Sequence, residues 1–273
     1  MGCPHPVGAW LKPPGGWSPR NRAHAGHLIH VWKQLAACRA AVLVTGAAVA
    51  AGCSGIAARQ PARPDFGPTS AAAHRTTLAA TGQRQATLAL VSGAATVTVS
   101  ASAPPGTLAR ASTPTDANVR PQFELASDRA QLFLDATGQS GAGAISIQLS
   151  PSVTWQLQFT GGSNQTILNL ANSKIASIDF TAGSSLIQMT LPRPSGTAVI
   201  TLAGGAGQVS LAVPRGIPVR LRLYGGASAA TLFGGTRAGV GRGTVLSSPG
   251  WAHAANRYDI DAPGGVSDIS VSN

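Results

Sequence analysis

Glycines at a nearly constant spacing divide the second half of the chain into similar units. Gly141, Gly162, Gly183, Gly205 and Gly226 are 21, 21, 22 and 21 residues apart. On each side of these glycines apolar and polar residues alternate, and this period of two predicts β-strands. The apolar positions that precede the glycines are Leu157, Phe159, Ile178, Phe180, Ile200, Leu202, Leu221 and Leu223. The corresponding positions that follow them are Ile145, Ile147, Thr166, Leu168, Ile187, Met189, Val209, Leu211, Ala230 and Leu232.

Two further glycines extend the repeat toward both ends of this region. Gly93 is flanked by Leu88, Leu90, Val97 and Val99, and Gly265 by Ile260, Ile269 and Val271. A fixed period with a single inward apolar set is typical of solenoids, and glycine suits a corner that needs a positive φ or a close backbone approach. We therefore predict an all-β fold, a parallel β-solenoid of about seven rungs, over residues 85–273. A sandwich of hairpins is the alternative, but the Asn-Gly or Asp-Gly turns typical of hairpins do not separate these strands.

The N-terminal part of the chain has the features of an export signal. Residues 40–51 are uncharged and mostly apolar, and Lys33 and Arg39 precede them. This arrangement predicts a secretory signal over residues 31–52, because a transmembrane helix needs about 20 apolar residues. The ending Ala51-Gly52-Cys53 resembles a lipobox, although Ala50 stands where a larger aliphatic residue is usual. The resemblance implies that Cys53 carries lipid such as palmitate. The alternative is an ordinary signal cut near Ala51.

The segments around this signal lack the repeat. Residues 1–30 have no periodicity, so we interpret them as a disordered extension or as the product of a start codon placed upstream of a true start near Val31. Residues 53–84 have almost no large apolar side chains and are predicted to be a flexible tether. This organisation predicts a lipoprotein on the extracytoplasmic face of the cell membrane, held there by its lipid anchor.

Charge narrows the choice of partner. The chain has 20 basic and 9 acidic residues, and five of the bases precede Cys53. A chain that begins at Cys53 would therefore carry 15 − 9 = +6. This charge suits an anionic surface, either lipid headgroups or an anionic polymer of the envelope, and a membrane protein is the other partner we consider. Nucleic acid is not expected, because the arginines are scattered and no aromatic platform accompanies them.

The residues offer little for catalysis or metal binding. Cys3 and Cys38 precede the cut, and a processed chain would keep only His74 and His253, so we expect no metal site and no cofactor. Neither a Gly-x-Ser-x-Gly motif nor a phosphate-binding loop is present. We therefore assign no catalytic residue.

Two predicted strands each carry two like charges that are two residues apart and therefore lie on the same face. Asp259 and Asp261 occupy outward positions equivalent to those of Arg220 and Arg222 when the glycines are aligned. We interpret them as charge ladders between neighbouring strands, the alternative being a hydrolase with two carboxylates. Because Arg220 is predicted to point outward and Leu221 inward, Arg220→Asp is expected to change stability by less than about 1 kcal/mol.

Six residues are candidates for binding. Arg193, Arg215, Arg220 and Arg222 lie on consecutive units, where a solenoid would bring them together. Between Gly226 and Gly265 the spacing widens to 39 residues, and the insert contains Trp251 and His253. An exposed aromatic residue in such a loop is a candidate ligand contact. Alternatively, Trp251 caps the end of the core.

The segments 204–221 and 258–266 carry a family resemblance. Gly204-Gly205-Ala206-Gly207-Gln208-Val209-Ser210-Leu211-Ala212-Val213-Pro214-Arg215-Gly216-Ile217-Pro218-Val219-Arg220-Leu221 resembles the DUF4097-type putative adhesins and the C-terminal domain of cell-wall-active antibiotic response proteins. So do Tyr258-Asp259-Ile260-Asp261 and Gly264-Gly265-Val266. The resemblance covers about residues 140–273. It implies a β-solenoid at the extracytoplasmic face, in some members linked to envelope-stress sensing, with no catalytic residues. We expect a non-enzymatic surface module that binds an envelope component or partner protein. A carbohydrate-active enzyme on the same fold is the alternative.

Overall fold

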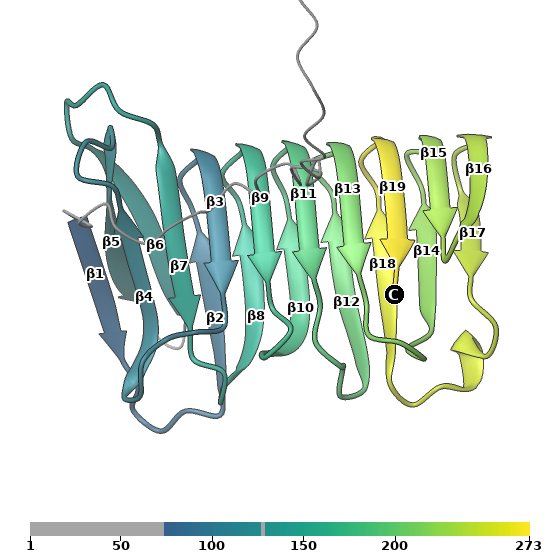
Figure 1. Ribbon diagram of the computed structural model, residues 1–273, viewed down its shortest axis with the longest axis horizontal. Coiled ribbons are helices and arrows are strands. Elements are labelled where there is room, and N and C mark those ends of the chain that lie inside the picture. The colour runs from purple at the N-terminus through teal and green to yellow at the C-terminus, as the bar shows by residue number, and fades with distance from the viewer. Residues whose placement is uncertain (1–73, 127–128) are drawn as a thin grey trace, which may run out of the picture. The chain divides into compact units, whose positions relative to one another are not determined.

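The computed structural model describes residues 74–126 and 129–273, which form two facing β-sheets and contain no α-helix (Figure 1). The all-β prediction is confirmed. No helix in the described part of the chain is long and apolar enough to span a membrane. The extension 1–30, the predicted signal 31–52 and Cys53 lie outside the described residues.

Sheet A has ten strands and sheet B has nine. In spatial order, the strands of sheet A are β1 (His74–Ala79), β4 (Thr107–Thr113), β7 (Ala144–Leu149), β3 (Ala94–Ser100), β9 (Ser163–Asn169), β11 (Ser184–Thr190), β13 (Ala206–Ala212), β19 (Val266–Ser272), β15 (Ala227–Leu232) and β16 (Gly235–Val240). Those of sheet B are β17 (Thr244–Ser247), β14 (Val219–Leu223), β18 (Arg257–Ala262), β12 (Thr197–Leu202), β10 (Lys174–Phe180), β8 (Thr154–Phe159), β2 (Gln85–Leu90), β6 (Arg129–Ala136) and β5 (Val119–Ala126). A single 3-10 turn, η1 (Trp251–His253), precedes β18.

The sheets are parallel in the middle and antiparallel at both ends, so the prediction of a wholly parallel arrangement is wrong there. Strands β1, β4 and β5 pair antiparallel at one end, and β16 and β17 at the other. The hairpin β15–β16 turns at Phe233 and Gly234, whose φ values are 48° and 87°. Two consecutive positive φ values produce the tight hairpin turn for which Asn-Gly is the usual sequence signal. Phe-Gly lacks that signal, and the hairpin was therefore missed.

The spatial order of the strands also departs from their order in the chain. The pair β2 and β3 lies between β6 and β7 on one side and β8 and β9 on the other. Near the other end, β18 and β19 lie between β12 and β13 and the earlier pair β14 and β15. Near each end of the stack, therefore, strands that are neighbours in space are distant in the chain.

The inward positions inferred from the repeat form the core. Of the predicted apolar positions all are buried except Leu232, which is partly buried and packs against the core. Phe159 and Phe180 stack with their ring centroids 4.6 Å apart, because parallel pairing places equivalent side chains side by side. Thr166, the polar member of the set, hydrogen-bonds Ser163 at 2.7 Å. Burial of the apolar set is the main stabilising term of the fold.

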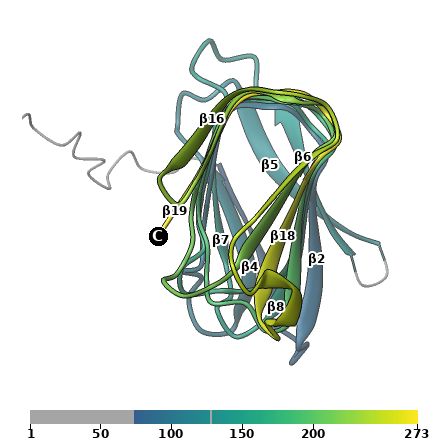
Figure 2. The ribbon, with the colours of Figure 1, turned by 90° about the vertical axis from the view of Figure 1, so that its right-hand side faces the viewer.

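Glycine turns join the two sheets along one edge, at the top of Figures 1 and 2, and longer loops join them along the other. A Cβ on Gly161 would lie 2.2 Å from the backbone of Ser92, and one on Gly204 would lie 2.1 Å from that of Ala182. Close approach of neighbouring turns therefore requires glycine at these positions. Gly205, with φ 77°, requires it for conformation as well.

The folded part begins earlier than predicted. Strand β1 lies inside residues 53–84, which were assigned to the tether. It pairs antiparallel with β4, and its Leu78 packs against the core. A strand with a single apolar residue at its inner face has too weak a pattern to be recognised in sequence.

Candidate binding surface

Two arginines of β14 lie opposite two aspartates of β18 on the outer face of sheet B. The register pairs Arg220 with Asp259 and Arg222 with Asp261. Arg220 donates from Nε to Oδ1 of Asp259 at 2.9 Å and from Nη2 to Oδ2. Arg222 binds Asp261 in the same two-pronged way, and its Nη2 also donates to Oδ2 of Asp259 at 3.0 Å. The expected charge ladder is confirmed, and we call these four residues the ion-pair ladder.

The ion-pair ladder is partly buried and electrically balanced. The side chain of Asp259 is 8% exposed, and those of Arg220 and Arg222 are 25% and 28% exposed. The hydrogen bond to Asp259 raises the pKa of Arg220, and the bond to Asp261 raises that of Arg222. Two positive and two negative charges cancel, so the ladder adds little attraction for an anionic ligand. Both carboxylates already accept guanidinium donors, an arrangement typical of a structural network.

Trp251 lies over this ladder rather than at the end of the core. The guanidinium carbon of Arg220 is 3.6 Å from the centre of the Trp251 ring, and that of Arg257 is 4.4 Å away. The indole N–H donates to the carbonyl of Tyr258 at 2.7 Å. The loop 248–256 is therefore fastened to sheet B by cation–π contacts and a hydrogen bond. His253 is exposed on the same turn, and its side chain forms no hydrogen bond or ion pair with the described residues.

A row of bases follows the loop edge of the stack, at the bottom of Figure 1, where the strands of sheet B begin. In spatial order, these bases are Arg84 before β2, Lys174 at the start of β10, Arg193 before β12, Arg257 at the start of β18 and Arg215 before β14. None of the five forms an ion pair with a described residue. The described loops that carry or directly precede them, 80–84, 170–173, 191–196, 213–218 and 248–256, contain no acidic residue. We call these five residues the basic edge.

Three bases of the basic edge donate hydrogen bonds to neutral acceptors on neighbouring segments. Arg193 Nη2 donates to the carbonyl of Arg215 at 3.4 Å, and Lys174 Nζ to that of Ser152 at 3.4 Å. Arg257 donates to the hydroxyl of Thr197 at 3.0 Å. Because carbonyls and hydroxyls carry no charge, the positive charge of the basic edge remains uncompensated.

The structure thus sorts the six predicted binding residues into different environments. Arg193 and Arg215 come together on the loop edge, although β18 separates the strands that follow them. Arg220 and Arg222 are committed to aspartates, and Trp251 is held by its arginine neighbours. Sequence analysis missed Arg84, Lys174 and Arg257. What they share is a position at or just before the first residue of a strand of sheet B. This pattern can be recognised only when the strand boundaries are known.

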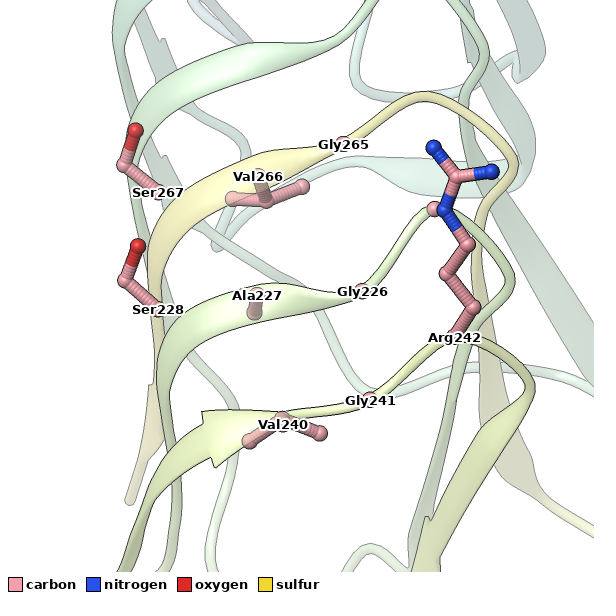
Figure 3. A pocket seen from close by; sticks show the side chains of 10 residues that line it. Gly226, Ala227, Ser228, Val240, Gly241, Arg242, Gly265, Val266 and Ser267 are labelled. Atoms are coloured by element: carbon pink, nitrogen blue, oxygen red, sulfur yellow. The ribbon is translucent and has the colours of Figure 1, made fainter.

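An open groove lies along the edge where glycine turns join the two sheets, at the end of the stack that carries β16. It has a volume of about 430 Å³ and is lined by the turn glycines 226, 241 and 265 (Figure 3). Arg242 extends over it, exposed and without an ion pair to a described residue, while Ser228 and Ser267 lie at its outer side. A single arginine over a shallow surface offers few fixed contacts. Within residues 74–126 and 129–273, no group of three His, Cys, Asp or Glu residues is placed to hold a metal ion.

Comparisons with known proteins relate this chain by its fold. No family model matches it, and no curated protein does. A putative cell adhesion protein from Clostridium sporogenes is similar in structure, with a TM-score of 0.52 and 14% identity over 72% of this chain and 98% of that one. A putative adhesin from Bacteroides fragilis is 8% identical over 72% of this chain and 96% of that one, with a TM-score of 0.20. The first likeness shows a shared fold, and the second is too low to support an argument.

Proposed function

We propose that this chain is an adhesin-like surface protein that binds without catalysis, and that its basic edge holds an anionic polymer of the cell envelope. The observation that supports this most directly is the row of five bases with no ion pair to a described residue. Strands β2 and β14 are five strand spacings apart, and at about 4.8 Å per spacing the row extends over roughly 24 Å.

The single file of the bases favours a linear polymer over a lipid bilayer. Successive strands offer charges along one line, which a chain bearing repeated phosphate groups can follow. Each contact is weak in water, but several contacts to one polymer act together through effective concentration. A bilayer presents a plane of headgroups and would gain little from bases confined to one line.

Three finer points belong to the same proposal. The seven strand pairs that are parallel in both sheets are the coils of a short β-solenoid, which the antiparallel strands close at each end. The chain is a DUF4097-type surface protein: the resemblance of the run Gly204–Leu221 supports this part of the proposal, as does the cell adhesion name of the similar structure. Binding of an envelope polymer would also suit a part in envelope-stress sensing.

Salt and matched variants test the basic edge. The purified protein is sedimented with cell wall that carries its phosphate polymer, with the same wall after removal of that polymer, and with anionic lipid vesicles. One variant replaces three exposed bases of the edge by serine, and a control replaces three exposed bases elsewhere, so both lose the same charge. The edge variant is Lys174→Ser, Arg193→Ser and Arg215→Ser, and the control is Arg75→Ser, Arg237→Ser and Arg242→Ser.

We expect wall binding that falls steeply with salt, because exposed charges are screened within about 10 Å at 0.1 M. The edge variant should bind about tenfold more weakly, and the control should stay within about twofold of the unaltered protein. Equal losses in both variants, or equal binding to wall without its phosphate polymer, would contradict the proposal. Binding to vesicles that exceeds binding to wall would assign the edge to lipid instead.

We also propose that Cys53 carries the lipid that holds the chain at the membrane. Labelling with a fatty-acid probe should mark the chain in membrane fractions and leave Cys53→Ala unlabelled. An unaltered chain that reaches the membrane fraction without label would refute the anchor.

A further inference from the structure

The outer face of sheet A carries a single charged residue over five consecutive strands. It is the face toward the viewer in Figure 1. Its outward positions on the five consecutive strands β3, β9, β11, β13 and β19 alternate with buried core residues. They are Thr96, Thr98, Ser100, Gln165, Ile167, Asn169, Leu186, Gln188, Thr190, Gln208, Ser210, Ala212, Asp268, Ser270 and Ser272. We call these fifteen residues the neutral face.

The neutral face has almost no charge and much unused hydrogen-bonding capacity. Eleven of its fifteen residues are uncharged Ser, Thr, Asn or Gln, and Asp268 is its single ionised residue. Ser210 contacts Ser270, which also reaches a backbone carbonyl, and Ser100 contacts Ser102. The other neutral polar side chains bond no described group, so their donors and acceptors face solvent. On the outer face of sheet B, charged residues interrupt the neutral ones: Lys174 and Asp179 on β10, and the ion-pair ladder on β14 and β18.

The register arranges these groups in rows along the stack. Parallel pairing places Thr98, Ile167, Gln188, Ser210 and Ser270 side by side on successive strands. A second row follows Ser100, Asn169, Thr190, Ala212 and Ser272. Neighbouring strands are about 4.8 Å apart, so polar groups recur at that interval except at Ile167 in the first row and Ala212 in the second. In Figure 2, which looks along the stack, the central strands of each sheet lie nearly over one another, so the rows run straight.

We infer that the neutral face binds an uncharged, extended polysaccharide lying along the stack. Sugar hydroxyls donate and accept hydrogen bonds in the same way as the Ser, Thr, Asn and Gln groups of the face. The sugar rings of an extended β-1,4-linked chain recur at nearly the interval of the strands, so each ring meets a new strand. A phosphate polymer finds no base on this face, and a lipid surface finds little apolar area.

The absence of aromatic rings among these fifteen residues sets the character of the binding. Each sugar makes hydrogen bonds without stacking, and each such bond exchanges with water for little net gain. Affinity therefore depends on the number of consecutive sugars, through effective concentration. Binding is expected to be strong for long polymers and weak for short fragments.

This site is separate from the basic edge, and salt distinguishes the two. The purified protein is mixed with insoluble chitin and with cellulose, both uncharged, at low and high salt, and the bound fraction is measured. Binding to the neutral face should persist at high salt, because no ion pair contributes. Binding to either polysaccharide that disappears at high salt would belong to charged residues and would overturn the inference, as would no binding to both.

Matched variants locate the surface. One removes hydroxyls from the neutral face, and the other makes the same chemical changes on the outer face of sheet B. The first is Thr98→Val, Thr190→Val and Ser210→Ala, and the second is Thr87→Val, Thr201→Val and Ser177→Ala. Valine keeps the shape and strand preference of threonine, so both variants should fold. The first should bind about tenfold more weakly, and the second should bind as the unaltered protein does. Equal binding by both would overturn the inference.

A measurement without substitutions guards against variants that fail to fold. The side-chain amide resonances of Gln165, Gln188 and Gln208 on the neutral face are followed by NMR while a soluble chitin oligosaccharide is added to the unaltered protein. Gln156 and Gln158 on the outer face of sheet B are the internal control. Shifts confined to the neutral face support the inference. Shifts confined to sheet B, or none at saturating oligosaccharide, contradict it.

Discussion

The link between Arg220 and Asp259 should contribute more to stability than its position at the surface implies. An exposed ion pair is worth about 0–1 kcal/mol, whereas removing one partner of a buried pair costs about 3–5 kcal/mol. Here the carboxylate side is 8% exposed and the guanidinium side 25%, so solvent screens the pair only in part. After Arg220→Ala, Asp259 would keep a single donor, Nη2 of Arg222 at 3.0 Å, and Trp251 would lose a packing partner.

We therefore expect Arg220→Ala to lower the free energy of unfolding by about 2–3 kcal/mol, between the two limits. Urea unfolding of Arg220→Ala, Asp259→Asn and the double variant measures this cost and the coupling between the two residues. The coupling should be about 1–2 kcal/mol, as found for residues in one hydrogen-bond network. Arg237→Ala is the control, because Arg237 is exposed and forms no ion pair with a described residue, and it should change stability by less than about 0.5 kcal/mol. A cost for Arg220→Ala no larger than for Arg237→Ala, or a coupling near zero, would refute this reasoning.

Three further predictions concern the core and the turns. Burial raises the pKa of Tyr258 above the unfolded value of about 10. The stability that the neutral phenol contributes is therefore fully present below a pH of about 10 and is lost as the pH rises toward the folded pKa. The loss amounts to at most about 1.4 kcal/mol per pH unit. Urea unfolding midpoints, measured from pH 9 upward, should show this loss in Tyr224→Phe, which keeps Tyr258, and a smaller loss in Tyr258→Phe. Equal slopes of midpoint against pH in the two variants would disprove the assignment to Tyr258. Leu221→Asp, at a fully buried position, should cost several kcal/mol in the same assay, and a cost below about 1 kcal/mol would show that the strand register is wrong. Gly204→Ala should cost more than about 2 kcal/mol because its Cβ would lie 2.1 Å from backbone, whereas Gly241→Ala, with nothing within 4 Å, should be nearly neutral; similar melting temperatures for the two would contradict the close packing of the turns.

The inward and outward positions of the central strands could be predicted from the sequence because they depend only on local alternation. Ile178, Ile200 and Leu221 are all fully buried at equivalent positions, as the glycine spacing implied. Aligning the glycines also placed Arg220 opposite Asp259 without knowledge of the fold. A stability cost below about 1 kcal/mol for Arg220→Asp was expected for an outward residue. That expectation took no account of the partner carboxylate, whose side chain is only 8% exposed.

The order of the strands could not be predicted in the same way. Alternation specifies which face a residue occupies, but each parallel strand in such a stack presents a similar edge to its neighbours. Nothing local in residues 257–272 distinguishes a place beyond β15 from the place between β13 and β15 that they occupy. The choice depends on what closes the end of the stack. The hairpin from β15 to β16 and the strand β17 already occupy that end, so the last strand pair completes the interior.

This order makes the last strands of the chain responsible for the ion-pair ladder and for part of both proposed surfaces. Strand β18 carries Asp259 and Asp261, and its first residue, Arg257, belongs to the basic edge and packs on Trp251. Strand β19 carries Ser270 and Ser272 of the neutral face. Without β18, Arg220 and Arg222 would face no carboxylate on that side of β14, and two like charges would lie two residues apart on one strand. Insertion of β18 neutralises both charges and adds a base to the edge. The basic edge carries its uncompensated charge along the loops, where a polymer can reach it, and sheet A presents an uninterrupted uncharged surface from β3 to β13.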